Sequence, residues 1–391
     1  MGRRRARWVA DLASSRVATG AATGVLAVLL LVMAAAMALP AGAAAHRVQR
    51  GIIDDTWVMA APDQRAAIVK DLSHGLDCQV VRVTISWAKA EPQPGQYDEA
   101  YLGAVRESLA AAHGAGLQLM VTVYQTPEWA SDRAFWHDPP FEGLYSPGVY
   151  YPFYPAAKAK LDDWQRFSRH VAQSFRGLVR YYECWNEPNL WAYLYPQRTA
   201  KEPYLAVTRY GWLLKHFYLG VKAADSRAIV LGGATAPIGS NDKYRTSPQR
   251  FARNLVRLGN MRYMDGYSHH PYPVGPSKPM PPPEARPRFS AYTISLGNIA
   301  TLLQIVPKKP MYLTEYGYTT RPVPEFGGAQ VSEATQAAYM KRAFRYADRF
   351  SRIKLLMWFQ RIDVSGLYFG LRRPDGTRKP SWYAFAKLRN R

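Results

Sequence analysis

The sequence predicts an α/β protein built as a single (β/α)8 barrel, and three observations support this fold. Eight short apolar runs, typical of buried strands, start near residues 51, 79, 117, 180, 228, 264, 310 and 353. Segments with helical spacing lie between them, and the shortest interval (51 to 79, or 28 residues) has room for a strand and a helix. The 346 residues that follow position 45 (391 minus 45) suit one large barrel with insertions better than two small domains.

Residues 1–45 form a separate N-terminal segment. Five arginines precede residue 17, an apolar run covers residues 25–39, and Pro40 and small residues follow. This order is typical of a secretory signal peptide, with cleavage sites after Ala43 or Ala45. An uncleaved signal anchor is the alternative, because residues 25–45 are long enough to span a bilayer. We therefore expect a secreted or extracytoplasmic protein that contacts a membrane only through this segment, if at all.

The chain is strongly basic. Its net charge is +22, of which the N-terminal segment supplies +4 (five arginines minus Asp11), so residues 46–391 keep +18. After residue 50 the basic residues are dispersed and form no run of motif length, which argues against a nucleic acid partner. A basic surface in an exported protein instead suits work near an anionic envelope or an acidic polysaccharide.

The two cysteines, Cys78 and Cys184, lie in apolar strand contexts, which favours buried thiols over a disulfide. Cysteine and histidine residues also lack the close spacing of a structural zinc site. We expect no metal and no organic cofactor.

In the first half of the barrel, the second strand carries Arg82 within a β-branched run that ends at Trp87. A buried arginine must be paired, so we expect Arg82 to contact a carboxylate. The third strand leads into a long insertion, rich in aromatic residues, that reaches to about residue 154, and Trp129 near its start is a candidate for stacking on a ligand. The helices expected in this half cover residues 64–74, 97–113 and 161–175.

The second half repeats the same alternation. The expected helices cover residues 204–223, 251–258, 289–304, 332–350 and 379–388. Ser332 is placed to cap the fourth of these helices at its N-terminus. The sixth strand ends at the adjacent His269 and His270. Neighbours on a strand face opposite ways and are poorly placed to share one metal ion.

Two glutamates follow strands at matching positions. Glu187 lies in Trp185-Asn186-Glu187-Pro188-Asn189 after the fourth strand, and Glu315 ends the seventh strand, 128 residues later. The proline disfavours a helix at Glu187, so this side chain belongs to a loop. A single glutamate after a strand would be interpreted as a polar loop residue. A pair of glutamates at the same end of one barrel is the arrangement that glycoside hydrolysis requires.

These motifs resemble the retaining glycoside hydrolases of the family 39 and family 5 type, over roughly the whole chain after the N-terminal segment. The resemblance implies that Glu187 is the acid/base and Glu315 the nucleophile. It also implies that Arg82 and Tyr272 hydrogen-bond the nucleophile, that His270 lines the sugar site and that Asn186 bonds the sugar 2-hydroxyl. Trp358, on the eighth strand, falls where such enzymes carry an aromatic floor, with core packing as the alternative.

Trp87, Trp191 and Tyr318, near other strand ends, complete the expected substrate-binding residues with Trp129 and Trp358. The implied function is cleavage of β-linked O-glycosidic bonds in a poly- or oligosaccharide by double displacement. Three alternatives stay open: a non-catalytic barrel that binds glycans, a transglycosylase with the same residues, and a membrane-anchored scaffold of the envelope.

Overall fold

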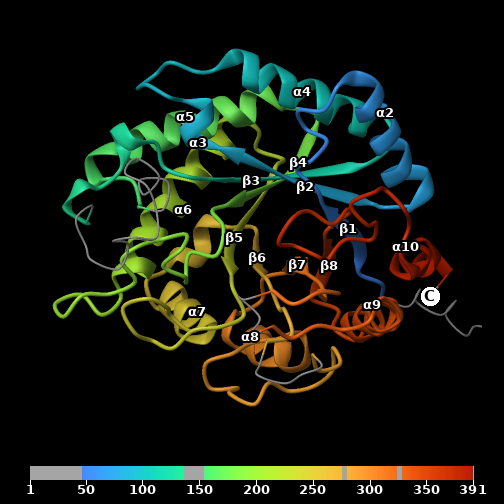
Figure 1. Ribbon diagram of the computed structural model, residues 1–391. Coiled ribbons are helices and arrows are strands. Elements are labelled where there is room, and N and C mark those ends of the chain that lie inside the picture. Colours follow the sequence, from blue (N-terminus) through green and yellow to red (C-terminus); the bar gives the residue numbers. More distant parts are fainter. Residues whose placement is uncertain (1–45, 136–153, 275–279, 324–327, 391) are drawn as a thin grey trace, which may run out of the picture. The chain divides into compact units, whose positions relative to one another are not determined.

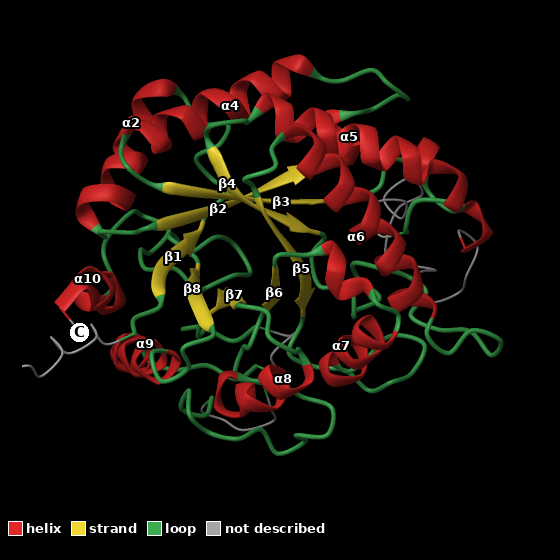
Figure 2. Cartoon of the chain, turned by 180° about the vertical axis from the view of Figure 1, so that it is seen from behind, coloured by secondary structure: helices red, strands yellow, loops and turns green. Residues whose placement is uncertain are grey.

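The computed structural model describes residues 46–135, 154–274, 280–323 and 328–390. Eight parallel strands form a closed barrel in sequence order, because β1 pairs with both β2 and β8. Figures 1 and 2 show the helices arranged around these strands. The strands are β1 Gln49–Ile53, β2 Val80–Ser86, β3 Gln118–Tyr124, β4 Val179–Cys184, β5 Ile229–Thr235, β6 Gly266–His269, β7 Met311–Tyr316 and β8 Ile353–Phe359. The predicted (β/α)8 TIM barrel is confirmed.

The helices begin with the signals that the sequence indicates. Ser332 caps α9 by accepting a hydrogen bond from the Thr335 amide, and Asp98 caps α4 in the same way. The helices are α2 Pro62–Lys70, α3 Trp87–Ala90, α4 Glu99–Gly114, α5 Leu161–Ser174, α6 Leu205–Ala224, α7 Pro248–Arg257, α8 Ile299–Ile305, α9 Glu333–Ala347 and α10 Pro380–Ala386.

One predicted helix is much shorter than expected. The segment 289–304 was expected to be helical throughout, but α8 starts only at Ile299, after a short 3-10 turn at Leu296–Asn298. The side chains of Ser295 and Asn298 form a capping box at this turn, which starts the helical segment there. The prediction of a helix from residue 289 was wrong.

The inside of the barrel is divided into an apolar layer and a polar layer. The apolar layer comprises Ile53, Val80, Met120, Tyr181, Leu231, Tyr312, Leu355 and Met357. Because side chains alternate along a strand, the next inward position on β2 is Arg82 and the next on β3 is Thr122. The apolar layer therefore supports a polar layer toward the carboxyl ends of the strands, where (β/α)8 barrels build their sites.

Both cysteines are buried free thiols, as expected. The insertion after β3 contains the 3-10 turns Glu128–Ala130 and Arg133–Phe135. Its aromatic residues between positions 136 and 153 lie outside the described residues. Across the described part, no helix combines the length and the apolar character that crossing a membrane requires.

The contact between α5 and α6 offers a test of this packing. A Cβ added at Gly220 would lie 2.4 Å from the carbonyl oxygen of Gln165, whereas a Cβ at Gly103 on α4 would meet no atom within 4 Å. We expect Gly220→Ala to destabilise the protein by about 1–3 kcal/mol, because the two helices must move apart. Gly103→Ala should stabilise it by about 0.5–1 kcal/mol through helix propensity. Urea unfolding of both variants checks this, and equal effects would contradict it.

Candidate active site

Arg82 lies at the centre of the polar layer and has only 3% of its surface exposed. Its Nη1 donates to Oε1 of Glu315 at 2.5 Å, and its Nη2 donates to Oδ1 of Asn186 at 3.1 Å. Its Nε lies 2.9 Å from Oε2 of Glu183. One buried guanidinium thus joins β2, β4 and β7, and the expected need for a carboxylate partner is met by two carboxylates.

Glu183 on β4 is a residue that the sequence analysis missed. It is fully buried and accepts hydrogen bonds from the hydroxyls of Thr122 and Thr314, both at 2.7 Å. With the Arg82 contact, both of its oxygens are paired, as a buried carboxylate requires. Like Arg82 in β2, Glu183 is a charged residue within an apolar run, and this pattern could have identified it from the sequence.

Glu187 projects from a loop whose backbone is held on two sides. Its amide donates to the Ala234 carbonyl at 2.9 Å, and its backbone adopts a positive φ of 42°. The side chain of Asn189 bonds the backbone of Ala236, Ile238 and Thr246. The loop after β4 is therefore joined to the loop after β5, which fixes the position of Glu187. Asn189, the last residue of the motif that contains Glu187, therefore has a structural role.

The two glutamates face each other across one histidine. Nδ1 of His270 lies 2.9 Å from Oε1 of Glu187 and 3.7 Å from Oε2 of Glu315. The Tyr272 hydroxyl donates to Oε2 of Glu315 at 3.0 Å. The closest ligand atoms of Glu187, His270 and Glu315 all lie within 4.8 Å of one another. The structure therefore brings together Arg82, Asn186, Glu187, His270, Tyr272 and Glu315, the six residues that the sequence analysis assigned to catalysis and its support.

The surroundings shift the pKa values of the two glutamates in opposite directions. Burial raises the pKa of Glu187, and the negative charge of Glu315 adds to this, against the opposing effect of His270. Burial also acts to raise the pKa of Glu315, but His270, Arg82 and the Tyr272 hydroxyl outweigh it, so that this pKa is lowered. Glu315 is thus the carboxylate that stays ionised, and Glu187 is the one that holds a proton more readily.

The site could in principle accept a metal ion, because Glu187, His270 and Glu315 each offer one ligand atom. However, Oε1 of Glu315 already accepts from Arg82 and Oε2 from Tyr272. A cation bound here would compete with the guanidinium for the same carboxylate. The donor set fits proton transfer better than metal binding.

A cavity of about 490 Å³ opens at these residues. Both glutamates, Arg82, Asn186 and Tyr272 line it. Its walls also include residues that the sequence analysis did not single out: Tyr124, Tyr193, Phe359, Leu367 and Phe369. Tyr124 ends β3 at an inward position, which its strand periodicity indicates, whereas Phe369 comes from a loop after β8 that no pattern placed. His270 is fully buried and reaches Glu187 rather than forming part of the cavity wall.

Three expected substrate-binding residues lie away from the cavity, and their assignment was wrong. Trp87, Tyr318 and Trp358 are fully buried. The indole of Trp87 donates to Glu91, that of Trp358 donates to the Phe369 carbonyl, and the Tyr318 hydroxyl donates to the Pro281 carbonyl. For β8 the error is one residue: Leu355 and Met357 face inward, so the next inward residue is Phe359, which lines the cavity.

The other two aromatic candidates are partly exposed but are not among the residues that line the cavity. The Trp129 indole donates to the Glu91 carbonyl and packs edge-on against Trp87. The Trp191 ring lies beside Tyr244, and its chain neighbours Leu190 and Ala192 line the cavity. Contact of either with substrate stays a prediction.

Comparison with known proteins assigns a family to this geometry. The profile described as Cellulase (glycosyl hydrolase family 5) matches residues 44–358, which is more than half of the chain. The chain belongs to glycosyl hydrolase family 5. This family is one of glycosyl hydrolases, and the closed barrel of eight parallel strands agrees with the assignment.

Solved structures show the same fold at low sequence identity. A family 39 glycoside hydrolase from Bacteroides cellulosilyticus WH2 matches with a TM-score of 0.59 and 18% identity, over 88% of this chain and 63% of that one. A monomeric β-xylosidase from Caulobacter crescentus CB15 matches with a TM-score of 0.60 and 19% identity, over 88% and 69%. Endo-glycoceramidase II from Rhodococcus sp., described as a lactosyl-enzyme intermediate, matches with a TM-score of 0.53 and 16% identity, over 87% and 78%.

The family 5 chain thus spans less than two thirds of the first of these structures. No curated protein matches the sequence significantly.

The opposite pKa shifts predict opposite effects of two isosteric variants on stability. The raised pKa of Glu187 means that its ionisation destabilises the fold above that pKa, and this penalty vanishes below the unfolded value of about 4.3. Glu187→Gln should therefore stabilise the protein by about 0.5–2 kcal/mol at about pH 8, with a smaller gain near pH 4.

The lowered pKa of Glu315 means that its ionisation stabilises the fold above the unfolded value, and this stability is lost as the pH falls through the folded pKa. Glu315→Gln should cost about 3 kcal/mol at about pH 8, because Arg82 loses a partner, and less at about pH 4. Urea unfolding at both pH values checks the pair. Destabilisation by both variants at the higher pH would contradict the assignment.

Proposed function

We propose that this enzyme is a retaining glycosidase that cleaves β-linked sugars by double displacement. The observation that carries the proposal is the spacing of the two glutamates, whose nearest oxygens lie within 4.8 Å of each other. Retaining enzymes place their carboxyl groups about 5–5.5 Å apart, whereas inverting enzymes leave about 6.5–9.5 Å for a water molecule.

In the first step, Glu315 attacks the anomeric carbon. Arg82 and Tyr272 hold this carboxylate ionised and oriented, since each bonds a different oxygen. Glu187, with its raised pKa, gives its proton to the leaving glycosidic oxygen. A covalent glycosyl ester on Glu315 results.

In the second step, water replaces the leaving group. Esterification removes the negative charge of Glu315, so the pKa of Glu187 falls and its carboxylate can take a proton from water. His270 bonds Oε1 of Glu187 and keeps it beside the reacting centre in both steps. Hydrolysis then releases the sugar with its original anomeric configuration.

The cavity walls indicate how the sugar is held. Asn186, fixed by Arg82, lines the cavity and can bond the 2-hydroxyl, a contact that strengthens in the transition state. Tyr124, Tyr193 and Phe359 supply aromatic surface for sugar rings. The β-xylosidase and the endo-glycoceramidase intermediate support β-linked substrates and a covalent route. The N-terminal signal segment supports export as the location of the activity.

Glutamine variants of the two glutamates test the assigned roles. Glu315→Gln should lower kcat by at least about 10⁴-fold on every active substrate, because no ester can form. Glu187→Gln should lower kcat by about 10²–10⁴-fold on natural glycans. With a dinitrophenyl glycoside, whose leaving group needs no proton, it should release a burst equal to the enzyme concentration.

These assays use a panel of β-glycans and aryl β-glycosides with residues 46–391, and Glu107→Gln on the exposed face of α4 serves as the control. Full activity of Glu315→Gln would contradict the assignment of Glu315 as the nucleophile. Binding of a glycan without release of sugar would favour a non-catalytic barrel. Longer products in place of free sugar would indicate a transglycosylase.

The dependence of activity on pH should be bell-shaped. Activity requires Glu315 ionised and Glu187 protonated, so kcat/KM falls below the lowered pKa of Glu315 and above the raised pKa of Glu187. Arg82→Lys should move the acidic limb to higher pH and leave the basic limb nearly in place. Proton NMR of the first product checks retention, and release of the inverted anomer would contradict the mechanism.

A further inference from the structure

The end of the barrel opposite the catalytic cavity is strongly cationic. The amino ends of the parallel strands meet there, together with the segments that lead into them. Eight exposed basic residues lie on these segments, and a ninth, Arg389, lies beside Arg47, which donates to its carbonyl oxygen. The nine are Arg47, Arg176, Arg180, Arg227, Arg262, Lys308, Arg349, Lys354 and Arg389. We call this set the basic face. Within the described part of the chain, none of the nine forms a salt bridge.

Four acidic residues on the same segments offset the basic face only in part. Asp77 pairs with Arg50 and Asp265 pairs with Lys222, neither of which belongs to the nine. Asp225 accepts from the Arg227 amide, and Asp348 accepts from the Val48 amide. The amide hydrogen bonds leave the formal charges of Asp225 and Asp348 in place, so the basic face carries nine positive charges minus two negative ones, or +7.

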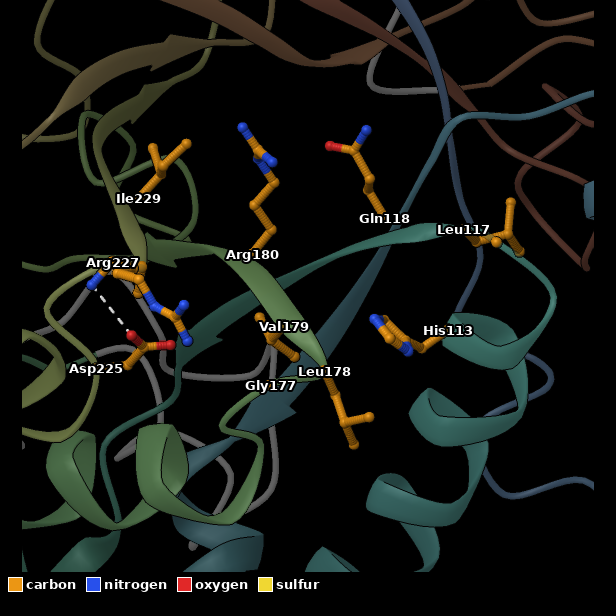
Figure 3. A pocket seen from close by; sticks show the side chains of 12 residues that line it. His113, Leu117, Gln118, Gly177, Leu178, Val179, Arg180, Asp225, Arg227 and Ile229 are labelled. Atoms are coloured by element: carbon orange, nitrogen blue, oxygen red, sulfur yellow. Dashed lines mark hydrogen bonds between the residues drawn. The ribbon is translucent and has the colours of Figure 1, made fainter.

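The basic face is hollowed on one side. A cavity of about 630 Å³ lies between the amino ends of β3, β4 and β5 (Figure 3). Arg180 extends into the middle of this view, with His113 on one side and Arg227 on the other. Asp225 also lines the cavity but is engaged with the Arg227 backbone. An anionic headgroup entering here meets two guanidinium groups.

The chain enters the barrel at the same end. His46 contacts the carbonyl oxygen of Ile353, the first residue of β8, and β1 begins three residues later at Gln49. The apolar run of residues 25–39 and the small residues after it precede His46 directly. The part of the chain that precedes His46 is thus joined to the barrel at the end that carries the basic face.

We propose that the basic face docks onto a bilayer surface that contains anionic phospholipids, which leaves the catalytic cavity at the far end open to glycans. Each arginine or lysine near such a surface strengthens binding roughly fivefold, and the attraction weakens within about 10 Å in salt. The continuity with the chain entry favours a membrane over a nucleic acid or a soluble polyanion.

Vesicle binding tests the proposal. The eight strands and the hydrophobic core lie within residues 46–391, which form a compact unit by themselves, so this segment is the protein used. We expect it to sediment with vesicles of phosphatidylcholine and phosphatidylglycerol in equal amounts, and not with phosphatidylcholine alone. Arg176→Gln, Arg180→Gln and Arg227→Gln combined should weaken binding roughly 100-fold.

A matched triple variant provides the control. Arg106→Gln, Arg253→Gln and Lys341→Gln remove the same charge from exposed positions midway along α4, α7 and α9. This variant should bind within about threefold of the unaltered protein, since its charges lie on helices at the side of the barrel and outside the basic face. Arg176→Lys, Arg180→Lys and Arg227→Lys combined should retain binding, because the positive charges are kept. An unchanged melting temperature shows that each variant is folded.

Four outcomes would overturn the proposal. The first is an equal loss of binding in the two triple glutamine variants, and the second is no preference for vesicles with phosphatidylglycerol. The third is release of the protein from vesicles by soluble glycerol phosphate at matched ionic strength. The fourth is tighter binding to hyaluronan or duplex DNA than to vesicles. Glycosidase activity on a soluble substrate is measured in parallel. Its absence would count against the proposed function and leave the vesicle result unaffected.

Discussion

The structure of the site depends on one buried cation. Arg82 contacts Glu315, Glu183 and Asn186, which belong to β7, to β4 and to the loop that carries Glu187. A guanidinium cannot lose its proton at any working pH, so its charge has to be matched within the barrel. The two carboxylates provide that match, and Thr122 and Thr314 complete the hydrogen bonds of Glu183. The position of Glu315 is thereby set by the arginine rather than by the open cavity.

The apolar runs made the barrel predictable from the sequence. The eight strands appear as apolar runs because both sides of a parallel barrel strand are buried, and this signal survives without any knowledge of the contacts. The catalytic group was predictable for other reasons. Arg82 and Glu315 are charged side chains within apolar strands, and Glu187 lies in a distinctive motif after β4. The role of Tyr272 came from the resemblance to known families. Counting alternate residues from Leu355 would have assigned Phe359 instead of Trp358 to the cavity.

The remainder depends on tertiary contacts that no local pattern contains. Trp87 directly follows β2, as a site residue would, yet it is the first residue of α3 and packs against Trp164 and Phe167. Phe369 reaches the cavity from a loop whose path is set by Asp363 and Gln360, and Tyr193 arrives through the loop that follows Glu187. The short α8 depends on a capping box that competed with a longer amphipathic pattern. In each case a specific side-chain contact decided the outcome.

Glu183 has a consequence for the charge balance of the proposed reaction. In the free enzyme Arg82 is shared between two carboxylates, so the group of three carries one negative charge when both glutamates are ionised. Formation of the ester on Glu315 removes that charge and leaves Arg82 and Glu183 as a neutral ion pair in the barrel interior. The covalent intermediate therefore never contains an isolated buried cation, whose desolvation would raise its free energy. The second carboxylate acts as a permanent counter-ion, which lets the nucleophile change its charge during each turnover.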